Sequence, residues 1–577
     1  MGNLLAHGLG KTLLSATFAI AIGLSLGACE EKKQEEAAQQ PAQQESTTAQ
    51  PAAEPQETQT ASTAAPAAKV PEEVVLSRGF GASPDTLDPH VNFGAREGWI
   101  QDDMYEGLVS YDSKGNLVPG AAEKWESSDD GKLWTFHLRD GLKWSNGDPL
   151  VAQDFVNAVT RQMEPKTASP RGYYFYSTLQ IEGAAEFSEK DGNDPKTVGI
   201  SAPDDRTIVI KLINPNPNIL YLMGSYYVPP LHKPSFDKFG GDFVKPGNIV
   251  NNGAYMMTEL VPQSHVTLVK NPNYWDAANV KIDKVVYVVT EDDQTELKRY
   301  KADELDTTNE IPSDQIDALK AELGGQVRLT TYVESQYLSF NVTKPPFDNI
   351  KVRQALAIGI DRQVLQEKIL KAGYQVNCGY SPPNDERYPQ PQVPECNMTN
   401  EERAEKGKAL LAEAGFGPDN PLKVSIESTT DNTAKKQAEG IALMWKQTLG
   451  VDAKVNAQEF QAWMDTFYAG GWDVLNDNLV GDMPGPESHL SYMKPSAEPG
   501  YNWKSDKYEE LMNQASEKAD IAERYKVMAE AEKALLDDYL VTPLNVTTSR
   551  HLVKPWLKGW DDNNLDVHPT KLLSVEK

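Results

Sequence analysis

Apolar residues recur three and four positions apart between 404 and 414, and this spacing predicts an amphipathic helix. Thr399 and Glu402, at the start of the helix, have the spacing of a capping box, in which each side chain bonds the other residue's backbone N–H. Gly415 follows at a position where helices commonly end. The pattern therefore predicts one capped helix from about Asn400 to Ala414.

A second helix is predicted from Ala438 to Leu449, and residues 451–455 then alternate between apolar and polar as in a β-strand. This succession of helix and strand is typical of an α/β region. Strict alternation also predicts a strand within 132–143, and two further strands are predicted at 283–290 and 327–341. The fold class is therefore mixed α and β.

The amino-terminal segment is apolar from about Leu13 and ends with Leu26-Gly27-Ala28-Cys29, after a positive charge at Lys11. These features are typical of a bacterial lipoprotein signal, in which the cysteine is lipidated after cleavage. Residues 1–28 are therefore predicted to be a signal peptide, and Cys29 a lipid anchor in a membrane. The alternatives are an ordinary signal peptide or a short membrane anchor, although the apolar stretch is short for a span.

Residues 29–72 are rich in Ala, Gln, Glu, Pro and Thr and contain no aromatic residue. Such a segment cannot bury enough apolar surface to offset the entropy lost on ordering. We predict a disordered linker that tethers a folded body to the membrane, or else a tail without a role.

The remaining residues, from about Val74 to Lys577, are enough for a large core and for two or three lobes. Lys and Arg number 56 against 84 Asp and Glu, so the formal net charge is −28. This charge makes phosphate backbones and anionic lipid surfaces poor partners. Nucleic-acid binding is therefore not expected.

Cys378 and Cys396 are the two cysteines that follow Cys29, and the segment between them is rich in proline. In an exported protein such a pair favours a disulfide over a metal site, and two free thiols are the alternative. A bridge across this loop contributes about 3 kcal/mol of stability by loop-closure arithmetic.

A search for catalytic and metal-binding motifs in the sequence gives no support for an enzyme. A G-x-S-x-G match at Gly23–Gly27 and a Gly-Lys-Thr run at Gly10–Thr12 both lie in the predicted signal peptide. The chain after Cys29 contains no H-E-x-x-H, C-x-x-C or G-x-G-x-x-G run. The histidines are scattered, with His489 predicted in a loop, so neither a metal site nor a cofactor is expected.

Residues Trp134–Gly147, continuing through Pro149 and Ala152 to Asp154-Phe155, resemble the signature of bacterial extracellular solute-binding proteins of family 5, which bind oligopeptides, dipeptides or nickel. Further blocks resemble the oligopeptide-binding members in the same order along the chain: Leu87–His90, Tyr105–Leu108, Thr167–Pro170, Pro246–Val250, Asn252–Tyr255, Asn271-Pro272, Tyr274-Trp275, Lys344–Phe347, Asp361-Arg362, Leu410–Gly415 and Val553–Trp556. The likeness therefore covers nearly the whole chain after the linker.

This resemblance implies a type II periplasmic-binding-protein fold, in which two lobes close on a ligand and the first lobe carries an extra inserted domain. The implied first lobe comprises 73–107, 229–332 and 547–577, the inserted domain 108–228, and the second lobe 333–546. The chain would cross between the lobes near Tyr332 and Val546, and these crossings would form the hinge.

The resemblance also implies capture of oligopeptides. An extended peptide can add to a strand edge through main-chain hydrogen bonds, and watered pockets then tolerate varied side chains. Every free peptide carries a cationic amino terminus, and burying that group requires a pairing carboxylate. In the family an aspartate provides it, and Asp482 falls on that position within Asn478–Pro484. The alternative is a solvated loop aspartate.

Four other residues are predicted to line the peptide site: Phe460, Tyr337, Leu479 and Gly481. Phe460 matches an aromatic residue of the family's site, and Tyr337 lies in a strand that would pair with the ligand. Either aromatic residue could instead belong to the core.

The chain also departs from the family pattern. Leu479, Asn476 and Ala434 stand where oligopeptide-binding members carry tryptophan, arginine and histidine. The missing basic groups help to hold peptide carboxyl termini, so the recognition of peptide length and of that terminus should differ.

The expected partners are oligopeptides, the permease and ATPase subunits of an ABC importer, and a membrane reached through Cys29, with the protein itself a monomer. Three alternatives remain. The same fold could bind a murein peptide, a dipeptide, haem, a nickel chelate or a sugar; the chain could be an enzyme; or it could be a surface adhesin or chaperone-like protein.

Overall fold

The computed structural model describes residues 73–577, apart from 93, 191, 225, 495–498 and 502. The predicted signal peptide, Cys29 and the predicted linker lie outside the described residues. Across the described part of the chain, no helix combines the length and the apolar character needed to cross a bilayer.

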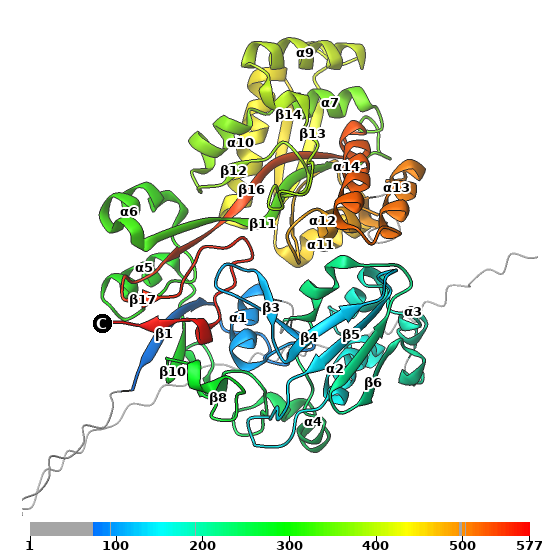
Figure 1. The fold of residues 1–577 in the computed structure, drawn as a ribbon. Coiled ribbons are helices and arrows are strands. Elements are labelled where there is room, and N and C mark those ends of the chain that lie inside the picture. The colour runs from blue at the N-terminus through cyan, green and yellow to red at the C-terminus, as the bar shows by residue number, and fades with distance from the viewer. Residues whose placement is uncertain (1–72, 93, 191, 225, 495–498, 502) are drawn as a thin grey trace, which may run out of the picture. The chain divides into compact units, whose positions relative to one another are not determined.

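The first sheet brings the start of the described chain beside a segment about 200 residues later (Figure 1). Its order is β1-β10-β9-β8, with β1 parallel to β10 and the other pairs antiparallel. The strands are β1 (Val75–Gly81), β8 (Tyr255–Val261), β9 (His265–Lys270) and β10 (Lys284–Val289). Leu76, Leu268 and Tyr287 are fully buried and belong to one hydrophobic cluster.

The second sheet is antiparallel, in the order β4-β5-β7-β6. Its strands are β4 (Ala122–Ser127), β5 (Leu133–Leu138), β6 (Ile200–Asp204) and β7 (Thr207–Lys211). Trp134, Phe136 and Leu138 of β5 are buried while the residues between them are more exposed, which confirms the predicted alternation. Helix α2 (Ala152–Met163) packs on β6 and β7 and buries Phe155 and Val159 in the same core.

The third and largest sheet has six strands in the order β12-β16-β11-β15-β13-β14. Its strands are β11 (Val327–Phe340), β12 (Gln375–Val376), β13 (Lys423–Thr429), β14 (Asp452–Gln458), β15 (Val474–Val480) and β16 (Val541–Leu552). The two long strands β11 and β16 pair antiparallel, although more than 200 residues separate them (Figure 1).

Hydrophobic clusters cover both faces of this six-stranded sheet. Successive side chains of one strand point to opposite faces and so enter different clusters. Tyr337 of β11 and Leu475 of β15 join one hydrophobic cluster, whereas their neighbours Leu338 and Val474 join another. The sheet therefore separates two cores.

Helices α7 (Ile350–Ile358), α9 (Asn400–Glu413) and α10 (Asn432–Leu449) pack together, with α10 against β13 and β14. Helices α11 (Phe460–Ala469), α13 (Asp506–Ser516) and α14 (Ile521–Asp537) contribute to the cluster that holds Tyr337. The remaining elements are α1 (Ala95–Met104), β2 (Val109–Tyr111), β3 (Leu117–Pro119), α3 (Ala184–Phe187), α4 (Lys233–Phe239), α5 (Asp293–Lys301), α6 (Ile316–Leu323), α8 (Arg362–Val364), α12 (Glu487–Tyr492), β17 (Leu557–Lys558), β18 (Ser574–Val575) and short 3₁₀ and π-helical turns.

The predicted helix near 400–414 is confirmed, together with its cap. The backbone N–H of Glu402 donates to Thr399 Oγ1 at 3.2 Å, and the backbone N–H of Thr399 donates to Glu402 Oε2 at 2.8 Å. Cys378 and Cys396 form the predicted disulfide.

The pairing of β11 with β16 is irregular where the hinge is predicted. The register shifts between Thr331 and Ser335, so the residues around Tyr332 leave the regular ladder. Within this irregular stretch, Glu334 accepts hydrogen bonds from Thr547 Oγ1 at 2.8 Å and from Asn478 Nδ2 at 2.7 Å. A bulge increases local twist and bending, which suits a hinge. The lobe boundaries and the hinge stay predictions.

Candidate functional site

Asp482 lies in a short, stiff loop between β15 and α12. Pro484 and Pro486 restrict the backbone, and Gly485 has φ 89°, a conformation that favours glycine. Met483, next to Asp482, is buried in the hydrophobic cluster of the β4–β7 sheet. The loop from the six-stranded sheet is therefore anchored in the core of another sheet.

Hydrogen bonds fix the backbone on both sides of Asp482. The N–H of Gly481 donates to the Val333 carbonyl at 2.7 Å, and the N–H of Asp482 donates to Ser488 Oγ at 3.0 Å. His489 Nε2 donates to the Leu479 carbonyl at 3.2 Å. A Cβ at position 481 would lie 2.8 Å from His489 Cε1, so only glycine fits without displacing the ring.

The Asp482 carboxylate faces two tyrosine hydroxyls that come from a distant part of the chain. Tyr174, in a π-helical turn (Tyr174–Thr178), donates its hydroxyl to Asp482 Oδ1. The Tyr227 hydroxyl lies 3.3 Å from the same oxygen and 3.2 Å from the Asp482 carbonyl. The two rings meet edge to face, with centroids 5.2 Å apart. The carboxylate is therefore held by neutral donors inside an aromatic surrounding.

Burial raises the pKa of Asp482 to about 6, because desolvation penalises the charged form, while hydrogen bonds from Tyr174, Tyr227 and Ser488 act in the opposite direction. The same burial raises the pKa of Tyr174 well above its usual value, so its hydroxyl stays protonated.

Arg171 is the cation that influences Asp482, but its guanidinium is already committed elsewhere. It donates to the backbone carbonyls of Pro89 and Tyr226 and to the Asn92 side chain, and it lies 3.6 Å from the centroid of the Tyr226 ring. Within the described part of the chain, no ion pair neutralises Asp482. Such a carboxylate is suited to receive a cationic group from a ligand.

One edge of β15 is open and leads towards Asp482. Strand β13 pairs with β15 only at Val474 and Leu475, whereas β11 pairs with β15 from Val474 to Val480. From Asn476 to Val480, no second strand pairs with β15 among the residues that the structure describes. An extended chain could add here through main-chain hydrogen bonds and end at Asp482.

The other four residues predicted to line the peptide site differ in their burial and in their distance along the chain from Asp482. Gly481 directly precedes Asp482, and Leu479 lies partly buried near the end of β15, beside a hydrophobic cluster. Phe460 begins α11, is 66% exposed and stacks on Trp463. The side chain of Tyr337 is fully buried in the core, where its hydroxyl lies 3.0 Å from that of Tyr501. A role for Phe460 or Tyr337 in ligand contact stays a prediction.

Asn476, at one of the positions that lack a basic residue, is buried and fully bonded. Its amide donates to Ser428 Oγ at 3.2 Å and to the Ala434 carbonyl at 3.0 Å, and its oxygen accepts from Gln437 Nε2 at 2.8 Å. This position therefore offers a ligand no free polar atom.

Three residues of the site were not predicted from the sequence as parts of it: Tyr174, Tyr227 and Ser488. Tyr174 and Tyr227 are separated from Asp482 by 308 and 255 residues, so no local pattern points to them. The predicted loop position of His489 is wrong, because the residue lies in α12, fully buried. Burial lowers the pKa of His489 to about 4, so the ring is a neutral donor.

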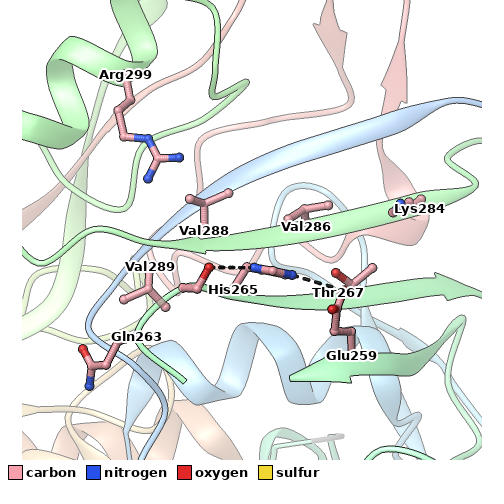
Figure 2. Close-up of a pocket in the computed structure, with 10 residues that line it drawn as sticks. Glu259, Gln263, His265, Thr267, Lys284, Val286, Val288, Val289 and Arg299 are labelled. Carbon is pink, nitrogen blue, oxygen red and sulfur yellow. Dashed lines mark hydrogen bonds and ion pairs between the residues drawn. The ribbon is translucent and has the colours of Figure 1, made fainter. Parts of the chain in front are cut away.

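A cavity of about 450 Å³ lies elsewhere, on the β8–β10 sheet (Figure 2). Its lining includes Glu259, His265, Lys284 and Arg299, and His265 bonds Glu259 and Ser264. None of the lining residues is a hydrogen-bond partner of Asp482. The cavity is therefore not part of the site.

An open strand edge beside a buried carboxylate that forms no ion pair among the described residues is suited to binding a solute. The family model described as bacterial extracellular solute-binding proteins, family 5 middle, matches residues 116–501. The chain belongs to this family of extracellular solute-binding proteins.

Individual members of the family are similar to this chain in both sequence and structure. The periplasmic oligopeptide-binding protein OppA of Escherichia coli is 35% identical over 510 residues, covering 88% of this chain and 93% of that protein. OppA of Haemophilus influenzae, solved in complex with the peptide RPPGFSPFR, gives a TM-score of 0.76 at 34% identity and covers 88% of this chain and 99% of that one. The murein tripeptide-binding protein MppA of Escherichia coli gives 0.77 at 32% identity, covering 88% and 99%. The fold is that of the periplasmic binding proteins, as expected.

Proposed function

We propose that this chain captures peptides outside the cytoplasm and delivers them to an ABC importer. The observation that carries the proposal is the Asp482 carboxylate, which forms no ion pair in the described residues and stands at the end of an open strand edge. A peptide bound along β15 would place its ammonium group on Asp482, and the tyrosine hydroxyls would complete the site.

The site also suggests how ligand capture is coupled to closure. On the predicted boundaries, Asp482 belongs to the second lobe, whereas Tyr174 and Tyr227 belong to the inserted domain 108–228. On these boundaries their hydrogen bonds would join the two sides of the ligand site, and we interpret this arrangement as the closed one. Opening would expose the carboxylate and the edge of β15 to incoming peptide.

The proposed anchor follows from Cys29 and the linker that continues to residue 72. A lipidated cysteine would hold the binding body near the permease, and a long polar linker would give it reach. We propose a periplasmic or extracellular location, with the permease and ATPase subunits as partners and the protein as a monomer. A catalytic function is not part of the proposal.

Native mass spectrometry of the full chain, purified without added ligand from an exporting host, tests the ligand class. A binding protein that closes tightly on its ligand often keeps that ligand through purification. We therefore expect a series of short-peptide masses released on denaturation. A single murein-peptide mass would restrict the proposed ligands to murein peptides. The mass of a haem, a nickel chelate or a sugar would show that the ligand is not a peptide. An empty protein that also fails to bind short peptides would contradict the proposal.

The raised pKa of Asp482 predicts that peptide affinity depends on pH. Below about pH 6 the carboxyl is protonated in the ligand-free protein, so affinity should fall by about tenfold for each further pH unit. Above about pH 8 the peptide amine itself loses its proton, and affinity should fall again. Calorimetric titrations from pH 4.5 to pH 9 should therefore give a maximum between these limits.

Asp482→Asn provides the control for this profile. Asparagine does not titrate, so the acid limb should be flat in the variant while the alkaline limb persists in weakened form. An acid limb of the same steepness in both proteins would assign the titration to another group.

A further inference from the structure

A second buried constellation lies next to the Asp482 loop, and the proposed mechanism does not yet use it. Glu487, the first residue of α12, forms an ion pair with Arg524 of α14. Arg524 Nη2 lies 2.6 Å from Glu487 Oε1, and Nε lies 2.8 Å from Oε2, so the pair is bidentate. Both side chains are only 4% exposed. This geometry fixes α12 on α14 with little freedom.

The same pair reaches across to the segment that follows β7. The remaining guanidinium nitrogen, Nη1, donates to the Pro215 carbonyl at 3.3 Å and to the Ala515 carbonyl at 3.0 Å. From the other side, Asn218 Nδ2 donates to Glu487 Oε2 at 3.5 Å. Pro215 and Asn218 lie in the predicted inserted domain, whereas Glu487, Arg524 and Ala515 lie in the predicted second lobe. The pair is therefore a bridge between the two.

The bridge is connected to Asp482, the residue proposed to bind the peptide ammonium group. Ser488 follows Glu487 and accepts the hydrogen bond from the Asp482 N–H at 3.0 Å. The loop between Asp482 and Glu487 contains Pro484 and Pro486, so it transmits a displacement of α12 to Asp482 with little slack. Fixing Glu487 thus fixes the carboxylate opposite Tyr174 and Tyr227.

The pair lies at the edge of a cavity. A cavity of about 330 Å³ adjoins it, lined on one side by Tyr176–Gln180 and Asn214–Asn216 and on the other by Ser491, Lys494, Met512, Ser516 and Met528. Beside the cavity the two sides are joined by hydrogen bonds, whereas Met483, four residues before Glu487, packs into the core of the β4–β7 sheet. Water can replace the Pro215 and Asn218 bonds while Arg524 and Glu487 stay paired.

We infer that the Arg524–Glu487 pair is a closure latch that positions Asp482 and holds the inserted domain against the second lobe. Arg524, Glu487 and Asn218 act through other groups and are positioning residues. The latch stabilises the closed arrangement even without ligand and slows the escape of a captured one. This inference rests on the proposed function, because it concerns how the same site closes.

Two variants test the latch without leaving a buried charge unpaired. Arg524→Lys keeps the positive charge next to Glu487 but cannot bond Glu487 and Pro215 with one planar fork. Asn218→Ala removes the opposite bond and leaves the ion pair intact. Arg353→Lys is the matched control, since Arg353 is a buried arginine that donates to the Asp538 and Phe347 carbonyls inside the predicted second lobe.

The first readout needs no ligand, so it is independent of the proposed function. Small-angle X-ray scattering of the ligand-free full chain should give a larger radius of gyration for Arg524→Lys and Asn218→Ala than for the unmodified protein and for Arg353→Lys. Superimposable profiles for all four proteins would overturn the latch. Thermal unfolding measured in parallel separates opening from loss of structure.

The second readout separates a latch from a binding contact. If peptides bind, the latch variants should release them about tenfold faster, because a hydrogen bond to a charged group is lost, while association rates stay within about threefold. Slower association with unchanged release would contradict the latch. Failure of every protein to bind peptide would reject the proposed function alone, since the scattering result would still decide the latch.

Discussion

Asp482→Asn should weaken the binding of peptides with a free amino terminus by about 2 to 5 kcal/mol, which corresponds to roughly 30-fold or more in Kd. Asparagine keeps the shape and can still accept the Tyr174 hydroxyl, but it removes the charge that would pair with the ammonium group. Because the carboxylate forms no ion pair in the described residues and the Arg171 guanidinium is bonded elsewhere, little else can replace it. Calorimetric titration with one peptide measures the difference.

Asp465→Asn is a suitable control for the loss of one negative charge. Asp465 is exposed on α11 and accepts only the Gln461 side chain at 3.2 Å among the bonds described. Its substitution should leave affinity within about twofold, because exposed charges contribute little. An equal loss in both variants would indicate a general electrostatic effect instead of a specific pair.

Glu532→Ala should lower the free energy of unfolding by about 3 kcal/mol or more, because it leaves several buried donors without an acceptor. Glu532 is fully buried in α14 and binds the segment enclosed by the disulfide. Its Oε1 accepts the Tyr380 N–H at 2.8 Å and the Ser381 N–H at 3.4 Å; its Oε2 accepts the Ser381 hydroxyl at 2.7 Å and the Tyr388 hydroxyl at 2.6 Å. Urea unfolding measures the loss.

Glu530→Ala is the matched control, since Glu530 is exposed on the same helix and should change stability by less than about 0.5 kcal/mol. Similar losses in both variants would contradict the account of Glu532 as a central acceptor.

The pH dependence of stability provides a second test of Glu532. Burial raises its pKa to about 7, so the folded state holds this proton more tightly than the unfolded state does. The Glu532 contribution is therefore largest below about pH 4.5 and is lost as the pH rises through about 7. Glu532→Gln should remove this component, and an unchanged profile would assign the titration elsewhere.

Local patterns were sufficient to predict much of the fold. The helix that begins at Asn400 follows from the reciprocal bonds of Thr399 and Glu402, which lie three residues apart. The buried face of β5 follows from alternation, because Trp134, Phe136 and Leu138 must share one side of the strand. In these elements the determining contacts are close in sequence.

The candidate site could be predicted only in part, because its partners are remote in the chain. The resemblance to the family placed Asp482, but nothing near position 482 specifies the hydroxyls of Tyr174 and Tyr227. Their approach depends on Met483 packing into the core of the β4–β7 sheet. A contact of this kind is a property of the assembled fold.

The sequence also does not distinguish aromatic residues of the core from aromatic residues of a binding site. Alternation places Tyr337 and Leu338 on opposite faces of β11, but it does not say which face meets a ligand. Tyr337 faces a core, whereas Phe460 begins a helix and is exposed. Composition and spacing are alike for an aromatic residue in a core and one in a binding site.

Recognition of the peptide amine by Asp482 can be tested by calorimetry at pH 7, in which one short peptide and its N-acetylated form are titrated into the unmodified chain and into Asp482→Asn. Acetylation should weaken binding to the unmodified chain by roughly 30-fold or more and should have little effect on binding to Asp482→Asn, because both changes remove the same charge pair. Equal affinities of the unmodified chain for the free and the acetylated peptide would contradict recognition of the amine by Asp482.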